Sequence, residues 1–175
     1  MRRAALAALA VAATSLLLAA CGDDEQVVHP YDKVAVPAVP DRTQPIPAAD
    51  AALADGQYWA TSSGVEGDAV QFVLTQAFFG PACEEELGAD ACDGEMGVLD
   101  PPSRDITVTP IGVSPLTVAS EQRENFAVPA DEFVRLVAGE APAATAPEGF
   151  AYQQYPFLVT VRGGNVVGIQ QIWMP

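Results

Sequence analysis

The chain has 175 residues, 50% of them hydrophobic, and its 8 Lys and Arg against 23 Asp and Glu give a formal charge of −15. This length accommodates one domain with a tail. The excess of acid repels nucleic-acid phosphates and anionic lipid headgroups, so no nucleic-acid partner is expected. The same charge also serves solubility, which is the simpler account of it.

The first twenty residues have the pattern of an export signal. Arg2 and Arg3 precede an apolar run from residue 4 to residue 20 whose polar members are a threonine and a serine. A positive start followed by a short apolar stretch is typical of secretory signals. The run is alanine-rich and short for a permanent membrane helix, which needs about 20 strongly apolar residues. Residues 1–20 are therefore predicted to be a signal peptide that directs the rest of the chain out of the cytoplasm.

The signal ends in Leu18-Ala19-Ala20-Cys21, which resembles the lipobox of bacterial lipoproteins. In those proteins the cysteine receives a diacylglycerol and, with palmitate among its acyl chains, becomes the new N-terminus. Two acyl chains give stable anchoring where one is marginal. The resemblance implies lipidation of Cys21 and a lipid-anchored location on the extracytoplasmic face of the cell membrane. A plain signal peptide with a chance cysteine and an uncleaved anchor are the alternatives.

Lipidation of Cys21 leaves Cys83 and Cys92 as an even pair in an oxidising compartment, where a disulfide is expected. It would close a short loop and contribute about 2–3 kcal/mol in the chain-entropy model. A two-thiolate metal site would need further Cys or His ligands nearby, and the sequence around the pair has none. Two free buried thiols would be unusual in an exported protein.

Residues 21–54 are predicted to be a disordered linker. They are acidic and proline-rich and show no apolar periodicity. About 30 residues could reach on the order of 90 Å in a fully polyproline-like form, enough to hold a domain away from the membrane. The linker also holds the chain's one histidine, His29, and its one lysine, Lys33.

Residues 55–175 are predicted to form a single α+β domain. Pro129, Asp131 and Glu132 precede an apolar stripe that ends before Gly139, which predicts one helix of about nine residues. The remaining apolar patterns alternate with a period of two, as strands do. The predicted strands cover residues 58–65, 69–79, 105–109, 116–120, 157–161 and 166–174. The expected architecture is an antiparallel sheet of about six strands built from hairpins, with the helix packed on it.

Residues 81–102 form an acidic insertion closed by the predicted disulfide, with seven acidic and no basic residues between Cys83 and Asp100. Carboxylates on such a loop could ligate Ca²⁺ through their oxygens. The weak candidate ligands are Glu84, Glu85, Asp90, Asp93 and Glu95. Their spacing departs from the EF-hand register, and charge runs are more often solvated surface, so a solvated loop is favoured. Beyond this Ca²⁺ hypothesis no cofactor is expected.

The predicted domain offers little for catalysis. Residues 55–175 contain no histidine or lysine, which removes Ser-His-Asp, histidine-zinc and Schiff-base chemistry. A carboxylate pair acting on envelope polymers is the less favoured, hydrolase alternative. Aromatic residues could line a binding groove, although in strands they more often belong to a core. These aromatics are Tyr58, Trp59, Phe78, Phe79, Tyr152, Tyr155, Phe157 and Trp173. The expected function is a non-catalytic module that binds an envelope protein or ligand.

The domain edges also carry a resemblance. Asp55-Gly56-Gln57-Tyr58-Trp59, the valine-rich hairpin over residues 158–167 and the final Trp173-Met174-Pro175 resemble segments of a group of uncharacterised actinobacterial exported lipoproteins. The resemblance covers the outer thirds of the domain. It implies an envelope location and a small β-rich fold, and it assigns no catalytic residues. The insertion with Cys83 and Cys92 departs from it.

Overall fold

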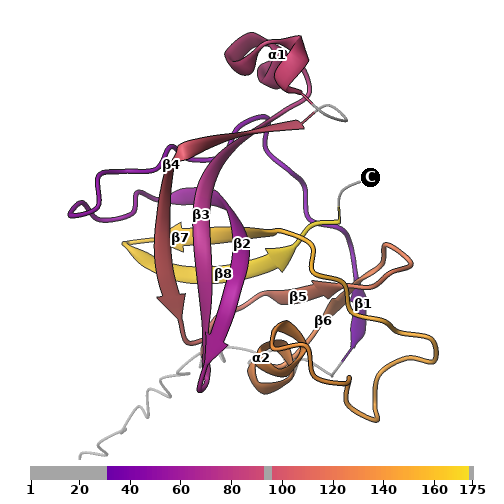
Figure 1. Ribbon diagram of the computed structural model, residues 1–175. Helices are drawn as coiled ribbons and strands as arrows, with labels where there is room; N and C mark the ends of the chain where they lie inside the picture. The colour runs from indigo at the N-terminus through magenta and orange to yellow at the C-terminus, as the bar shows by residue number, and fades with distance from the viewer. Residues whose placement is uncertain (1–30, 93–95, 174–175) are drawn as a thin grey trace, which may run out of the picture.

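A computed structural model describes residues 31–92 and 96–173, which fold around one mixed sheet (Figure 1). Within these ranges the sheet has eight strands, accompanied by two α-helices and one short 3-10 helix. The predicted α+β class is confirmed, whereas the expected six strands and one helix were too few. Cys21, His29, Asp93 and Glu95 lie outside the described residues.

The strand order across the sheet is β1-β6-β5-β8-β7-β2-β3-β4. The strands are β1 (Asp32–Val34), β2 (Gly56–Glu66), β3 (Ala69–Phe79), β4 (Met96–Val108), β5 (Leu116–Ala119), β6 (Asn125–Ala127), β7 (Phe157–Arg162) and β8 (Asn165–Gln171). The helices are α1 (Pro81–Leu87), η1 (Ala89–Ala91) and α2 (Ala130–Val137). All neighbouring strands run antiparallel except β5 and β8. That parallel pair corrects the expectation of a sheet built entirely from hairpins, because β5 and β8 are distant in sequence.

The two predicted hairpins form the middle of the sheet. In β3, Val70, Phe72 and Leu74 are fully buried and alternate with half-buried residues, which confirms the pattern expected of a strand with one face on a core. The β7–β8 turn uses Gly163 and Gly164, whose φ angles are 56° and 76°. Tight hairpin turns of this kind need positive φ at both central residues, which glycine adopts without strain.

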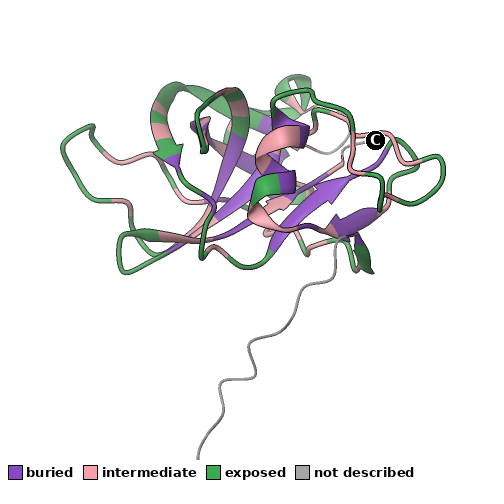
Figure 2. Cartoon of the chain, turned by 90° about the horizontal axis from the view of Figure 1, so that it is seen from below, coloured by how far each residue is buried: buried purple, intermediate pink, exposed green. Residues whose placement is uncertain are grey.

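Helix α2 closes the main core against the sheet (Figure 2). Its acidic first turn complements the positive end of the helix dipole. Phe133, Leu136 and Val137 lie three and four residues apart, and all three are buried. Phe133 meets Phe157 of β7 edge to face, with ring centroids 5.8 Å apart. The predicted helix is thus confirmed, together with the face that it buries.

The described fold already includes residue 31, ahead of the predicted boundary at residue 55. Strand β1 pairs with β6, and Tyr31 is 6% exposed in the main core. Further along, the Thr43 hydroxyl accepts a hydrogen bond from the Ala77 N–H at 2.8 Å, and the Thr43 N–H donates to the Ala77 carbonyl at 2.9 Å. The second half of the predicted linker is therefore part of the domain. Its proline-rich composition hides this, because the apolar side chains that reach the cores, such as Tyr31 and Val39, follow no regular period.

A smaller apolar cluster lies on the other face of the sheet. Trp59, Ala77, Leu158 and Ile172 are buried there, and Val39 from the N-terminal segment packs against them. Lys33, expected in the linker, lies in β1, where its ammonium group is 2.6 Å from the Glu124 carboxylate. The domain therefore does contain a lysine, contrary to the sequence-based expectation.

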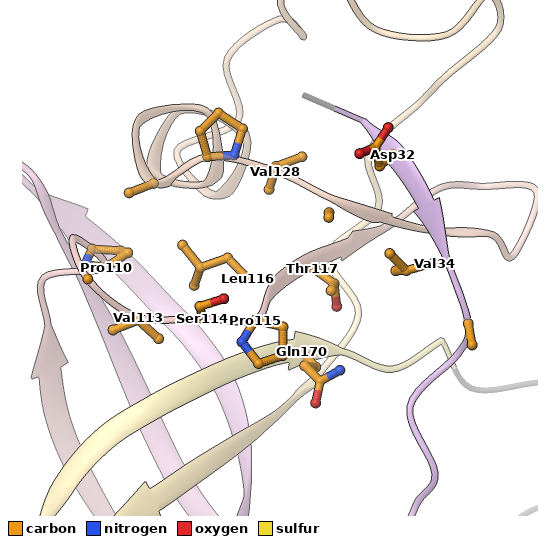
Figure 3. Close-up of a pocket in the computed structure, with 15 residues that line it drawn as sticks. Asp32, Val34, Pro110, Val113, Ser114, Pro115, Leu116, Thr117, Val128 and Gln170 are labelled. Atoms are coloured by element: carbon orange, nitrogen blue, oxygen red, sulfur yellow. The ribbon is translucent and has the colours of Figure 1, made fainter. Parts of the chain in front are cut away.

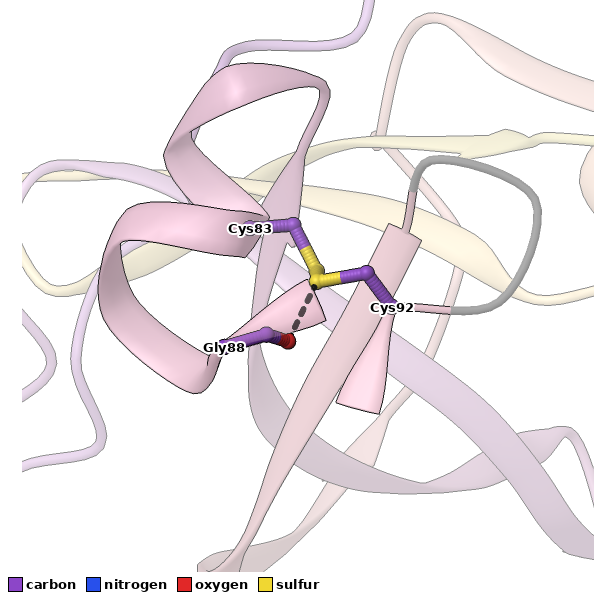
Figure 4. Close-up of a disulfide and its surroundings, with 3 residues drawn as sticks. All are labelled: Cys83, Gly88 and Cys92. Carbon is purple, nitrogen blue, oxygen red and sulfur yellow. Dashed lines mark hydrogen bonds between the residues drawn. A yellow bond between two sulfur atoms is a disulfide. The ribbon is translucent and has the colours of Figure 1, made fainter. Parts of the chain in front are cut away.

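The first half of the acidic insertion is helical. Pro81 occupies the first turn of α1, where its missing N–H costs nothing, and η1 follows directly. The predicted disulfide joins Cys83 of α1 to Cys92 (Figure 4). Residues 96–102, assigned to the insertion, instead extend the predicted 105–109 strand into β4, which pairs with β3. None of the helices found in the described ranges is long and apolar enough to cross a membrane.

Candidate functional site

Two of the described carboxylates of the acidic insertion face an arginine. Glu85 and Glu86 turn toward Arg42, at 3.6 Å and 2.8 Å, across exposed surface. Asp90 is exposed on η1. No group of three or more His, Cys, Asp or Glu residues placed to hold a metal occurs in residues 31–92 or 96–173. The Ca²⁺ hypothesis therefore finds no ligand set among residues 81–92 and 96–102 of the insertion.

Most of the candidate aromatics belong to the core. Tyr58, Trp59, Phe78 and Phe157 are each at most 4% exposed. Phe79 meets Trp59 edge to face, with centroids 5.5 Å apart. Tyr152 and Tyr155 are half-buried. The strand aromatics thus belong to the core, as the alternative to a binding groove predicts.

Trp173 lies under the Arg123 guanidinium, whose carbon is 4.6 Å from the ring centroid. A cation over an aromatic face is attracted by the ring quadrupole. Here this contact fixes the last described residue against the β5–β6 turn.

Glu132 of α2 is the one buried carboxylate in residues 31–92 and 96–173. It accepts hydrogen bonds from the Tyr31 hydroxyl, from the Ala143 N–H at 2.8 Å and from the Arg135 guanidinium at 2.9 Å. Burial, and then the bond to Glu132, raise the pKa of Tyr31 above its ordinary value. Both Glu132 oxygens are engaged, so this cluster ties the start of the domain to α2. A facing pair of buried carboxylates, which the hydrolase alternative requires, is not found in this part of the chain.

A pocket of about 740 Å³ opens between β1, the β4–β5 connection and the start of α2 (Figure 3). Strand β1 and the residue after it form one wall with Asp32, Val34 and Ala35. Residues 110 and 112–115 form the opposite wall, and residues 127–130 lead along a third side into α2. Ligand sites in proteins commonly have volumes of about 300–1,000 Å³. The pocket is therefore large enough for a small organic molecule.

Part of the pocket surface is a row of residues across four neighbouring strands. Asp32 of β1 lies opposite Ala127 of β6, Ala127 lies opposite Thr117 of β5, and Thr117 lies opposite Gln170 of β8. Because side chains of directly paired residues share a face, these four lie side by side. The parallel β5–β8 pair is what brings Gln170 into the row.

Thr117 carries an unsatisfied polar group in this row. The residue is 1% exposed, and within the described structure its hydroxyl has no hydrogen-bond partner. Figure 3 shows its side chain between Val34 and Gln170. A buried hydroxyl without a partner costs roughly 1–3 kcal/mol, so such groups are rare and call for an explanation.

The pocket lining holds few groups that can ionise. Aliphatic side chains and prolines dominate it, and Asp32 is its one ionisable side chain among the described residues. Ser114 lines the pocket, yet the lining has no His or Lys that could activate it. Sequence reasoning missed this site because four separate segments build it, none with a motif of its own. Comparisons with protein-family models, with curated proteins and with solved structures find no match to this chain.

Proposed function

We propose that this chain is a lipid-anchored, extracytoplasmic binding module of the cell envelope, and that the pocket beside β1 is its ligand site. The observation that supports the binding role is the unpartnered Thr117 hydroxyl in an aliphatic pocket of about 740 Å³. Small-molecule sites usually combine an apolar concavity with a small number of polar groups that point into it. The envelope location rests on the leader and on the Leu18–Cys21 motif.

The binding role can be tested with a fluorescent apolar reporter, N-phenyl-1-naphthylamine, titrated into the full chain carrying Cys21→Ser and purified without detergent. We expect saturable fluorescence enhancement. Ala35→Trp, which places a large ring at an exposed position of the pocket wall, should reduce it at least tenfold. The matched control is Ala38→Trp, an exposed alanine on the same segment that does not line the pocket. Equal binding by both tryptophan variants would place the reporter elsewhere and contradict the proposed site.

The anchor is tested separately in cells. Labelled palmitate should enter the wild-type chain and should not enter Cys21→Ser. Membrane fractionation should follow the same division. An unlabelled wild-type product of full length in the cytoplasm would contradict the lipoprotein part of the proposal.

A further inference from the structure

The charge of the pocket is set by one group. Asp32 is exposed at the edge of the pocket in Figure 3, and the described lining contains no Lys, Arg or His. The adjacent Lys33 does not offset it in the lining, since successive strand residues point to opposite faces and Lys33 pairs with Glu124. The whole chain carries a formal charge of −15. An anionic ligand would meet repulsion from both the rim and the surrounding protein, whereas a cation would be attracted.

The side chains that line the pocket indicate the chemistry of the uncharged part of the ligand. Val34, Leu116, Val128 and three prolines line the pocket, and no aromatic ring does among the described residues. A flat aromatic cation would therefore find no stacking partner. A flexible or saturated hydrocarbon body would bury apolar surface against these aliphatic groups.

Thr117 adds a hydrogen-bonding position within the pocket. Its hydroxyl can both donate and accept, and no described group satisfies it. Asp32 and Thr117 belong to the same cross-strand row, with Ala127 between them. The ligand body would therefore lie over Thr117 while the charged head stays at the rim.

We infer that the pocket binds a cationic amphiphile, an aliphatic molecule with an ammonium group that pairs with Asp32. This inference rests on the proposed binding function and adds the ligand class to it. Asp32 determines specificity through charge, and the aliphatic walls supply most of the affinity. Because the carboxylate is exposed, its contribution to discrimination should be modest, about two- to fivefold in affinity.

Three probes with the same eight-carbon chain isolate the head group: octylamine, which is a cation at pH 7, 1-octanol and octanoate. Isothermal titration into the full chain carrying Cys21→Ser should rank them in that order, with octylamine about two- to fivefold tighter than octanol. The preference should shrink when ionic strength rises from 0.01 M to 0.5 M, because exposed charges are screened.

Single substitutions test whether Asp32 causes the preference for octylamine over octanol. Asp32→Asn should abolish the difference between octylamine and octanol, while Asp50→Asn, a change at an exposed acid outside the pocket, should preserve it. Loss of the preference in Asp50→Asn, or its survival in Asp32→Asn, would overturn the role given to Asp32.

The outcomes separate the two levels of the proposal. Equal affinities for the three probes, all weakened by Ala35→Trp and not by Ala38→Trp, would overturn the cationic class and leave the binding site standing. Probe binding that Ala35→Trp does not affect would overturn both. No binding of any probe would overturn the inference, and the naphthylamine titration would then decide the proposed function by itself.

Discussion

Removing the Tyr31 hydroxyl should destabilise the whole domain, although the residue lies in a segment whose composition predicts a linker. Tyr31→Phe keeps the ring, and with it the edge-to-face contact to Phe150 at 4.9 Å. It deletes the hydrogen bond to Glu132, a carboxylate that is 4% exposed. Hydrogen bonds to charged groups contribute about 1.5–3 kcal/mol. Because the Ala143 N–H still donates to the same oxygen, we expect the lower end of this range, a loss of about 1.5–2 kcal/mol in the free energy of unfolding.

Urea unfolding followed by tryptophan fluorescence measures this free energy, and the slope with denaturant should be unchanged. At roughly 3 °C per kcal/mol for a domain of this size, the Tm should fall by about 5 °C. Tyr155→Phe is the matched control, because its half-buried hydroxyl makes no hydrogen bond among the described residues. A loss below about 0.5 kcal/mol in Tyr31→Phe, or an equal loss in the control, would refute the role given to the Tyr31–Glu132 contact.

Three further predictions concern stability. Replacing Cys83 and Cys92 together by serine should cost about 2–3 kcal/mol, because the disulfide closes a loop with a sequence separation of 9; urea midpoints with unchanged m would show it. Gly97→Ala should cost roughly 1–3 kcal/mol, since the added carbon would come within 2.8 Å of the Cys83 sulfur, and a wild-type Tm would contradict this. Burial raises the pKa of Tyr152 from 10.0 to about 12 and also raises that of Tyr31. The folded state then holds these protons more tightly than the unfolded state, so stability should be complete below pH 10 and fall from pH 10 toward pH 12, as thermal melts at stepped pH would reveal.

Local patterns predicted the elements that carry strong periodicity. Strand β3 has the bounds that its alternation predicts, and α2 buries the stripe that its spacing predicts. Strands β1 and β6 escaped prediction because three residues are too few to show a period. Pro101 and Pro102 looked like the end of a loop, yet they lie in β4 at the sheet edge, where a missing N–H is tolerated.

The candidate site was beyond local patterns altogether. Its cross-strand row joins Asp32 and Gln170 to the Thr117–Ala127 pair of β5 and β6, so it draws on three distant parts of the chain. The parallel β5–β8 pairing determines which of them meet, and such long-range pairing leaves no local signature. What the sequence does show is that the chain is acidic and has few basic residues, and the proposed preference of the pocket for cations draws on that same property.

The inclusion of residue 31 in the described fold limits how far the domain could lie from a membrane. The segment from Gly22 to Tyr31 has ten residues, and fully extended it spans about 35 Å, against the 90 Å or so allowed by a linker running to residue 54. Were Cys21 acylated as proposed, a short tether would hold the domain close to the bilayer surface. This tether would join the domain directly before β1, the strand that forms one wall of the pocket. Lipid-borne or membrane-proximal amphiphiles would then be the molecules within its reach, and tension on the anchor would act first on the wall of the binding site.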